Sequence, residues 1–100
     1  MIEWERIAGF DWDASNARKS IDKHDVSQAE AEQVFFNEPL LTVPDAKHSA
    51  IEQRIHALGR TDDGRLLHIT FTLRDKDTKI RVISARDMSR KERGYYDQDS

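Results

Sequence analysis

The sequence predicts an α+β fold in which an antiparallel sheet carries two helices from the N-terminal half of the chain and a short C-terminal helix. Apolar residues between 14 and 35 recur with the three-to-four-residue spacing of helices. Between 54 and 85 they alternate instead, as in strands with one buried face. Strands and helices do not alternate along the chain, which disfavours a parallel sheet. We therefore expect the helices to cover one face of the sheet and to leave the other face open.

The first expected elements are a short strand and a helix. Apolar residues over 6–12 favour the strand, although Gly9 weakens their alternation. Asp13 is suited to cap the helix that follows, and Ala14 and Ile21 lie on its apolar face.

A second helix and an irregular connection come next. Ser27 and Glu30 form a capping box, and the helix that begins there should end near Asn37. The stretch 38–50 contains both prolines of the chain, and proline removes a backbone donor and restricts the residue before it. We expect this connection, which contains His48, to lack regular structure.

Three strands and a final helix complete the prediction. The strands are expected over 54–60, 66–73 and 80–85, with turns at 61–64 and 74–78. In the third strand the alternation sets Ile80, Val82 and Ser84 against Arg81, Ile83 and Ala85. Ser89 and Glu92 repeat the capping box, so a short helix should run from there toward Tyr96.

The two faces of this sheet should differ in chemistry. The apolar side of the middle strand, expected to pack under the helices, consists of Leu67, Ile69, Phe71 and Leu73. The other side carries His68, Thr70 and Thr72, and the neighbouring strand offers Arg54, His56 and Arg60. Arginine, histidine and threonine side chains beside Arg86 are the groups that a phosphate-binding surface requires.

Composition limits the class of protein. A chain of 100 residues fits a single domain, 1–100, and 37% hydrophobic with 35% charged residues and a mean hydropathy of −0.80 describe a soluble protein with a thin core. Without cysteine there is neither a disulfide framework nor a thiolate metal site. No signal peptide, membrane span, phosphate loop or dinucleotide motif is present, and the histidine spacing is not that of a metal site. We expect a cytoplasmic protein that needs neither cofactor nor metal.

Charge is distributed unevenly. The formal net charge of −3 and a pI near 5.8 argue against coating of nucleic acid by bulk electrostatics. Residues 1–50 carry five Lys or Arg against ten Asp or Glu, whereas residues 51–100 carry eleven against nine. The basic residues concentrate in 79–93, where six oppose two acidic residues.

Four stretches resemble the BrnT family of toxins in order and spacing. They are FDWD at 10–13, KHDVSQAEAEQVF at 23–35, GRTDDGRLL at 59–67 and RVISARDMSRKERGYY at 81–96. The most specific is the last, in which a strand ending in ISAR runs into a capped basic helix with an ER pair and a tyrosine. The resemblance implies a RelE-like fold and a ribonuclease that inhibits translation. It also implies neutralisation by an antitoxin resembling BrnA, whose ribbon-helix-helix part binds DNA.

RNA cleavage without a metal needs a base for the 2′-hydroxyl, an acid for the leaving oxygen and cations for the phosphorane-like charge. The expected catalytic residues are Arg86, Arg60, His48 and Glu52. The expected RNA-binding residues are Arg81, Arg65, Lys23, Arg54 and His68. The expected antitoxin contacts are Arg90, Arg93 and Tyr96.

Each candidate also has a structural interpretation. Surface arginines commonly pair with carboxylates, and Glu52 could simply pair with Arg54. His24 fits the end of a helix better than a catalytic site, and tyrosines 95 and 96 more often pack a terminal helix than donate protons. Trp4 and Trp12 fit core positions better than base stacking.

A second class of function competes with the ribonuclease. The acidic net charge favours a non-catalytic interaction module, either a degenerate toxin or a corepressor that acts while bound to the antitoxin. Expression discriminates the two classes, because a toxin should arrest growth unless its partner is present.

Overall fold

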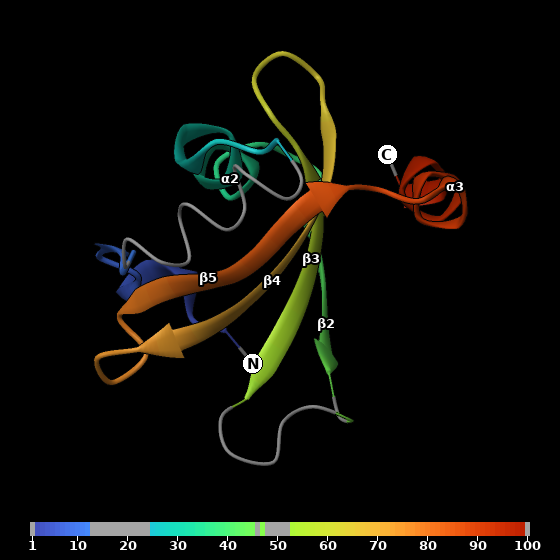
Figure 1. Cartoon of the computed structure of the whole chain (residues 1–100). Coiled ribbons are helices and arrows are strands. Elements are labelled where there is room, and N and C mark those ends of the chain that lie inside the picture. The colour runs from blue at the N-terminus through green and yellow to red at the C-terminus, as the bar shows by residue number, and fades with distance from the viewer. Residues whose placement is uncertain (1, 13–24, 46, 48–52, 100) are drawn as a thin grey trace.

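A five-stranded sheet stands between two helices in the computed structural model, which describes residues 2–12, 25–45, 47 and 53–99 (Figure 1). The elements in chain order are η1 (Trp4–Arg6), β1 (Gly9–Phe10), α2 (Gln28–Val34), β2 (Leu41–Asp45), β3 (Arg54–Arg60), β4 (Leu66–Arg74), β5 (Lys79–Asp87) and α3 (Arg90–Asp99). The three long strands and both capped helices match the predicted positions. The helix predicted from Asp13 lies outside the described residues. Within the described part, no helix is long and apolar enough to span a membrane.

The sheet is mixed, with strand order β1-β5-β4-β3-β2. Strands β2 to β5 pair antiparallel, but β1 runs parallel to β5, with Gly9 opposite Lys79. The prediction of a purely antiparallel sheet is therefore wrong at this edge. The irregular connection predicted over 38–50 is also wrong in part, because β2 forms there as an edge strand. Pro44 is tolerated in it because an edge strand has one side without ladder hydrogen bonds.

The core lies between the sheet and α2, as predicted. Leu67, Ile69 and Phe71 are fully buried and pack with Ala31 and Val34 of the helix. Gly59 lets the helix approach closely, because a Cβ at this position would lie 2.5 Å from Val34 Cγ1.

An irregularity in β5 changes which of its residues face this core. Thr70 pairs with Ser84, but Phe71 pairs with Val82, so Ile83 is the extra residue of a β-bulge. Ile80, Val82 and Ala85 are consequently buried together. The predicted alternation, with Ser84 on the side of Val82, is wrong because the bulge shifts the period by one residue.

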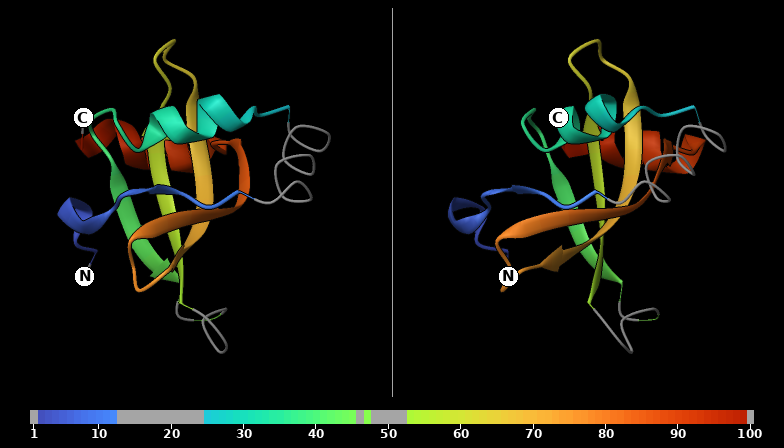
Figure 2. Two further views of the ribbon diagram at one scale, coloured as in Figure 1. Left: turned by 90° about the vertical axis from the view of Figure 1, so that its left-hand side faces the viewer. Right: turned by 60° about the vertical axis from the view of Figure 1, so that its left-hand side comes forward.

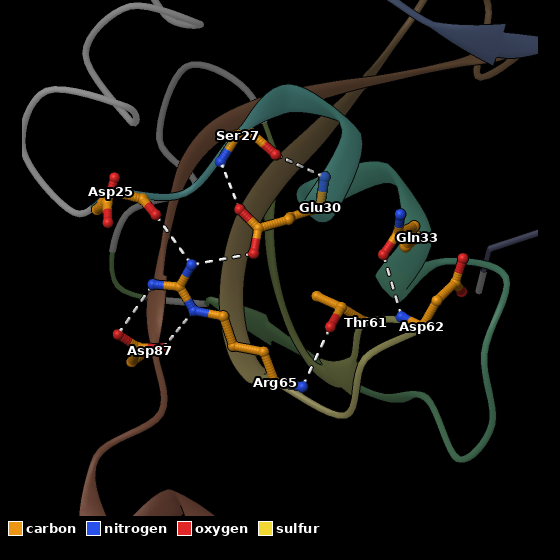
Figure 3. A network of polar contacts seen from close by, with 8 residues as sticks. All are labelled: Asp25, Ser27, Glu30, Gln33, Thr61, Asp62, Arg65 and Asp87. Carbon is orange, nitrogen blue, oxygen red and sulfur yellow. Dashed lines mark hydrogen bonds and ion pairs between the residues drawn. The ribbon is translucent and has the colours of Figure 1, made fainter.

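A polar network fastens the start of α2 to the sheet (Figure 3). The Ser27 hydroxyl accepts from the Glu30 amide at 3.1 Å, and the Glu30 carboxylate accepts from the Ser27 amide at 3.0 Å, which confirms the capping box. Arg65, at the start of the β4 hairpin, donates to Glu30 at 3.0 Å, to both oxygens of Asp87 and to the Asp25 carbonyl. One guanidinium thus joins α2 to the end of β5.

The two helices cover opposite faces of the sheet, contrary to the prediction that all helices share one face (Figures 1 and 2). α3 lies against the side that carries His68 and Arg86, where its Glu92 reaches both residues. Tyr96 is 3% exposed, and its hydroxyl donates to the Pro39 carbonyl at 2.6 Å. This anchor places α3 over one end of the face that was expected to be open.

Candidate active site

The face of the sheet opposite α2 brings histidine, arginine and carboxylate side chains together beside α3. His68 and Arg86 are paired across β4 and β5, and Leu58 of β3 follows on the other side of His68. Because side chains at paired positions point to the same side, both lie on the face that α3 partly covers. Their alignment is thus a direct result of strand register.

Arg86 is held from one side by Glu92. Its two terminal nitrogens donate to the two carboxylate oxygens at 2.8 and 3.0 Å, and one of them also donates to the Asp87 carbonyl at 3.0 Å. A guanidinium has five N–H donors, so these three bonds leave two for another acceptor. The side chain is 38% exposed, so a ligand can reach it.

Glu92 is fixed in its ionised state. The hydrogen bonds from Arg86, together with that from the Ser89 amide at 2.8 Å, lower the pKa of Glu92 to about 2. The Glu92 amide donates to the Ser89 hydroxyl at 3.2 Å, so the second predicted capping box is confirmed. The carboxylate that starts α3 is therefore also the one that orients Arg86.

His68 is enclosed and adjacent to these charges. Its side chain is 12% exposed, and Nε2 lies 3.8 Å from a Glu92 oxygen, beyond hydrogen-bonding distance. Nδ1 is buried and has no hydrogen-bond partner among the described residues. Burial first, and the positive charge of Arg86 second, lower the pKa of His68 below its usual value of 6.5. The imidazole is therefore neutral at pH 7, and its ring nitrogen without a hydrogen can accept a proton.

His56 lies beside His68, with 4.9 Å between the ring centroids. Its Nδ1 is 3.0 Å from the Thr70 hydroxyl and its Nε2 is 2.9 Å from Asp45 Oδ2. Since both ring nitrogens are engaged, His56 is better suited to position its neighbour than to exchange protons with a ligand. Asp45 belongs to β2, so the edge strand missed by the sequence analysis contributes directly to this site.

A comparison with known families gives this arrangement a context. The family model described as "Ribonuclease toxin, BrnT, of type II toxin-antitoxin system" matches residues 12–92. The chain belongs to the BrnT family. The 1.1 Å crystal structure of the Brucella abortus ribonuclease toxin BrnT superposes with a TM-score of 0.62 at 20% sequence identity, covering 82% of this chain and 97% of that one. This likeness shows a shared fold. No curated protein sequence matches the chain.

In this BrnT-family chain the structure gathers some of the predicted site residues and separates others. Arg60 is exposed at the end of β3, near the same end of the sheet as Arg86. Arg54 and Arg81 lie on the same face, at the opposite end of the strands. Lys23, His48 and Glu52, like His24, lie outside the described residues.

Four further predicted residues have other surroundings. Arg65 belongs to the network on the α2 side, away from the histidine pair, where the hydrogen bonds of Asp87 raise its pKa. Arg90 and Arg93 are exposed on α3, as an antitoxin contact would require. Tyr96 is buried, so it packs α3 and offers no surface to a partner while the helix stays in place.

Sequence reasoning misses Glu92 and Asp45 as members of the site. Local spacing identifies Glu92 only as a helix cap, because its contact with Arg86 depends on where α3 turns back over the sheet. Asp45 lies in the stretch expected to be irregular. Across the residues that the structure describes, no group of three or more His, Asp or Glu side chains is arranged to hold a metal ion.

Proposed function

We propose that this chain is an endoribonuclease toxin that cleaves RNA without a metal cofactor and thereby inhibits translation. The observation that carries the proposal is the pairing of Arg86, which has two unused N–H donors, with the neutral His68 at adjacent positions of one sheet face. Arginine supplies a planar fork for phosphate oxygens, and a neutral histidine can remove a proton from a hydroxyl.

The chemistry follows from these two groups. His68 Nε2 takes the proton of the ribose 2′-hydroxyl, whose oxygen attacks the adjacent phosphorus. Arg86 donates to the non-bridging oxygens, where negative charge develops in the transition state. The bond to the 5′-oxygen then breaks, which leaves a cyclic phosphate and a 5′-hydroxyl. For the acid that protonates the leaving oxygen, we propose His48 or Glu52, the candidates from the sequence.

The remaining cations suit the RNA backbone. Arg54 and Arg81 on the same face extend the positive surface along the strands, and Arg60 extends it at the other end. Such contacts bind phosphate independently of sequence and weaken as salt rises. In the cell we propose that a BrnA-like antitoxin, with a ribbon-helix-helix part, neutralises the toxin.

The test is incubation of purified protein with a structured RNA in EDTA, followed by mapping of cut sites and end chemistry. We expect wild-type protein to leave cyclic-phosphate ends, Arg86→Ala to lose this cleavage, and Arg90→Ala, a charge-matched control on exposed α3, to keep it. If wild-type protein cuts neither free nor ribosome-bound RNA, the ribonuclease proposal is wrong. The alternative is then the non-catalytic interaction module that the acidic net charge favours.

The pH dependence tests the role of His68. A base with a lowered pKa stays neutral, and therefore active, down to pH values below 6.5, so kcat/KM should begin to fall only under that value. His68→Gln should lower kcat/KM about 100-fold or more and abolish this fall of kcat/KM at acidic pH. If the same fall persists in the variant, the base that titrates is another residue.

A further inference from the structure

An open apolar groove separates the N-terminal segment from the C-terminal end of α2, on the side of the molecule away from the candidate active site. Figure 2 shows the two segments side by side across the same face of the sheet. The groove has a volume of about 960 Å³, and its walls include Trp4, Phe10, Phe35, Phe36 and Leu40. Two of the four large hydrophobic side chains found exposed among the described residues, Trp4 at 41% and Phe36 at 77%, lie in it.

The aromatic walls are fixed by the core behind them. Phe35 packs edge-on against the fully buried Phe71, with 5.1 Å between ring centroids. Phe10 and Trp4 follow at 5.6 and 6.2 Å from Phe35, and Phe36 lies 6.2 Å from Phe10. A hydrophobic surface that is already ordered loses little conformational entropy when it binds a partner.

The charges around the groove identify the kind of partner. Among the described residues that line it, Glu38 is the one that is charged, and Glu3 and Glu5 flank Trp4 on an exposed turn. The cation of that turn, Arg6, is engaged by Glu3 at 3.7 Å and by the Lys76 carbonyl.

The basic neighbours of the groove point elsewhere. Lys79 and Arg81 flank the lining residue Ile80, and by strand alternation they point to the other side of β5. An acidic rim repels RNA phosphates and attracts a basic polypeptide.

We propose that this groove is a docking site for the antitoxin, which fills it with bulky apolar side chains flanked by Lys or Arg. The inference rests on the antitoxin partner of the proposed function, and it names the surface. Because Phe36 and His68 lie on opposite sides of the sheet, a segment bound in the groove anchors the antitoxin without touching the catalytic groups. Anchoring and inhibition are then separable properties of the complex.

Phe36 allows a sharp test. It lines the groove and is 77% exposed, so Phe36→Lys replaces an apolar wall with a positive charge without disturbing the core. Tyr95→Lys is the matched control, because Tyr95 is an aromatic residue that is 64% exposed on α3, the rival antitoxin surface. Calorimetric titration with a purified BrnA-like antitoxin should show affinity reduced about 10-fold or more by Phe36→Lys and unchanged by Tyr95→Lys.

Two substitutions probe the chemistry of the groove. Phe36→Ala should weaken antitoxin binding about 10- to 100-fold, as expected for an aromatic anchor. Glu38→Lys should weaken it several-fold at low salt and less at high salt. Both variants should cleave RNA like the wild type. In 5-fluorotryptophan-labelled toxin, the ¹⁹F resonance of Trp4 should shift on binding far more than that of Trp12, which is held by Glu32.

Several results would overturn the proposal. Binding that is weakened by Tyr95→Lys and not by Phe36→Lys would move the anchor to α3, and binding unaffected by either would exclude both surfaces. Loss of RNA cleavage in a folded Phe36→Ala would make the groove a base-stacking surface instead. If the wild-type chain binds no antitoxin, the antitoxin partner of the proposed function is wrong together with the docking site. The cleavage assay contains no antitoxin, so it tests the ribonuclease activity independently.

Discussion

The two described helices begin alike and end up in different chemical settings. Both start with Ser-x-x-Glu, and in both the capping glutamate also binds an arginine of the sheet, Arg65 at α2 and Arg86 at α3. Arg65 divides its donors between Glu30, both oxygens of Asp87 and a carbonyl. Arg86 has the single carboxylate of Glu92 and one carbonyl, and it keeps two donors.

The difference teaches that a local motif does not fix the role of its partner. A second carboxylate turns the Arg65 site into a closed ion-pair network that fastens elements together. Within the described part of the chain, Arg86 has no second carboxylate beside it but has His68, whose pKa is lowered. The same capping motif therefore places a guanidinium that can bind an anion next to a histidine that can accept a proton. We therefore expect substitutions of Arg65 to affect stability and substitutions of Arg86 to affect catalysis.

The largest expected effect is on cleavage. Arg86→Ala should lower kcat about 100- to 1000-fold, as is usual when one donor to a developing oxyanion is removed. Arg65→Ala should leave kcat within about twofold but lower the free energy of unfolding by about 1–3 kcal/mol, because Glu30 and Asp87 lose their shared partner. Single-turnover cleavage and urea unfolding of the same preparations measure both. Equal loss of cleavage in folded Arg65→Ala would erase the proposed distinction.

The next effect is on stability as a function of pH. The pKa of Glu92 falls from 4.5 to about 2 on folding, so its stabilisation is present above pH 4.5 and is lost as pH falls from 4.5 toward 2. This shift corresponds to a contribution on the order of 3 kcal/mol. Glu92→Gln should therefore be less stable than wild type at pH 7 and equally stable near pH 2, measured by urea unfolding.

Glu30→Gln supplies the comparison. The hydrogen bond from the Ser27 amide, helped by Arg65, lowers the pKa of Glu30 as well, so its stabilisation is also lost as pH falls below 4.5. The carboxylate is more exposed than that of Glu92, and we expect a smaller difference from wild type at pH 7. A larger pH-dependent loss in Glu30→Gln than in Glu92→Gln would reverse the order proposed for the two sites.

The smallest effects should come from the capping hydroxyls. Ser27→Ala and Ser89→Ala each remove one acceptor from a helix start, which typically costs about 1 kcal/mol. Thermal unfolding measures this loss. Ser89→Ala should leave cleavage close to that of the wild type, because it keeps the backbone amide that donates to the Glu92 carboxylate. A clear loss of cleavage at equal occupancy of the folded state would show that the hydroxyl is also needed to position Glu92 beside Arg86.

Local patterns predicted much of this fold. Alternation located β3 and β4, and the Ser-x-x-Glu spacing located the starts of α2 and α3, because strand and helix periods and caps depend on near neighbours. What failed depends on distant contacts. The pairing of β1 with β5, the bulge at Ile83 and the side of the sheet taken by α3 are settled by packing across the molecule.

The same local patterns reach only part of the candidate site. Residue chemistry and strand alternation place Arg86 among the expected catalytic residues and His68 among the expected RNA-binding residues, and register brings the two together. Glu92 could not be assigned to them, since its position follows from the path of the chain after β5. Asp45 was missed because Pro44 made its strand look irregular, although an edge strand accommodates proline.

The parallel contact between β1 and β5 also sets an order of assembly. The strand that carries Gly9 meets its partner roughly 70 residues later in the chain, so closing this contact requires a long loop and follows the formation of the hairpins. During translation the segment with Trp4 leaves the ribosome long before Ile80 does. The aromatic groove is consequently among the last features to form, and a partner that docks there would bind finished chains and ignore incomplete ones.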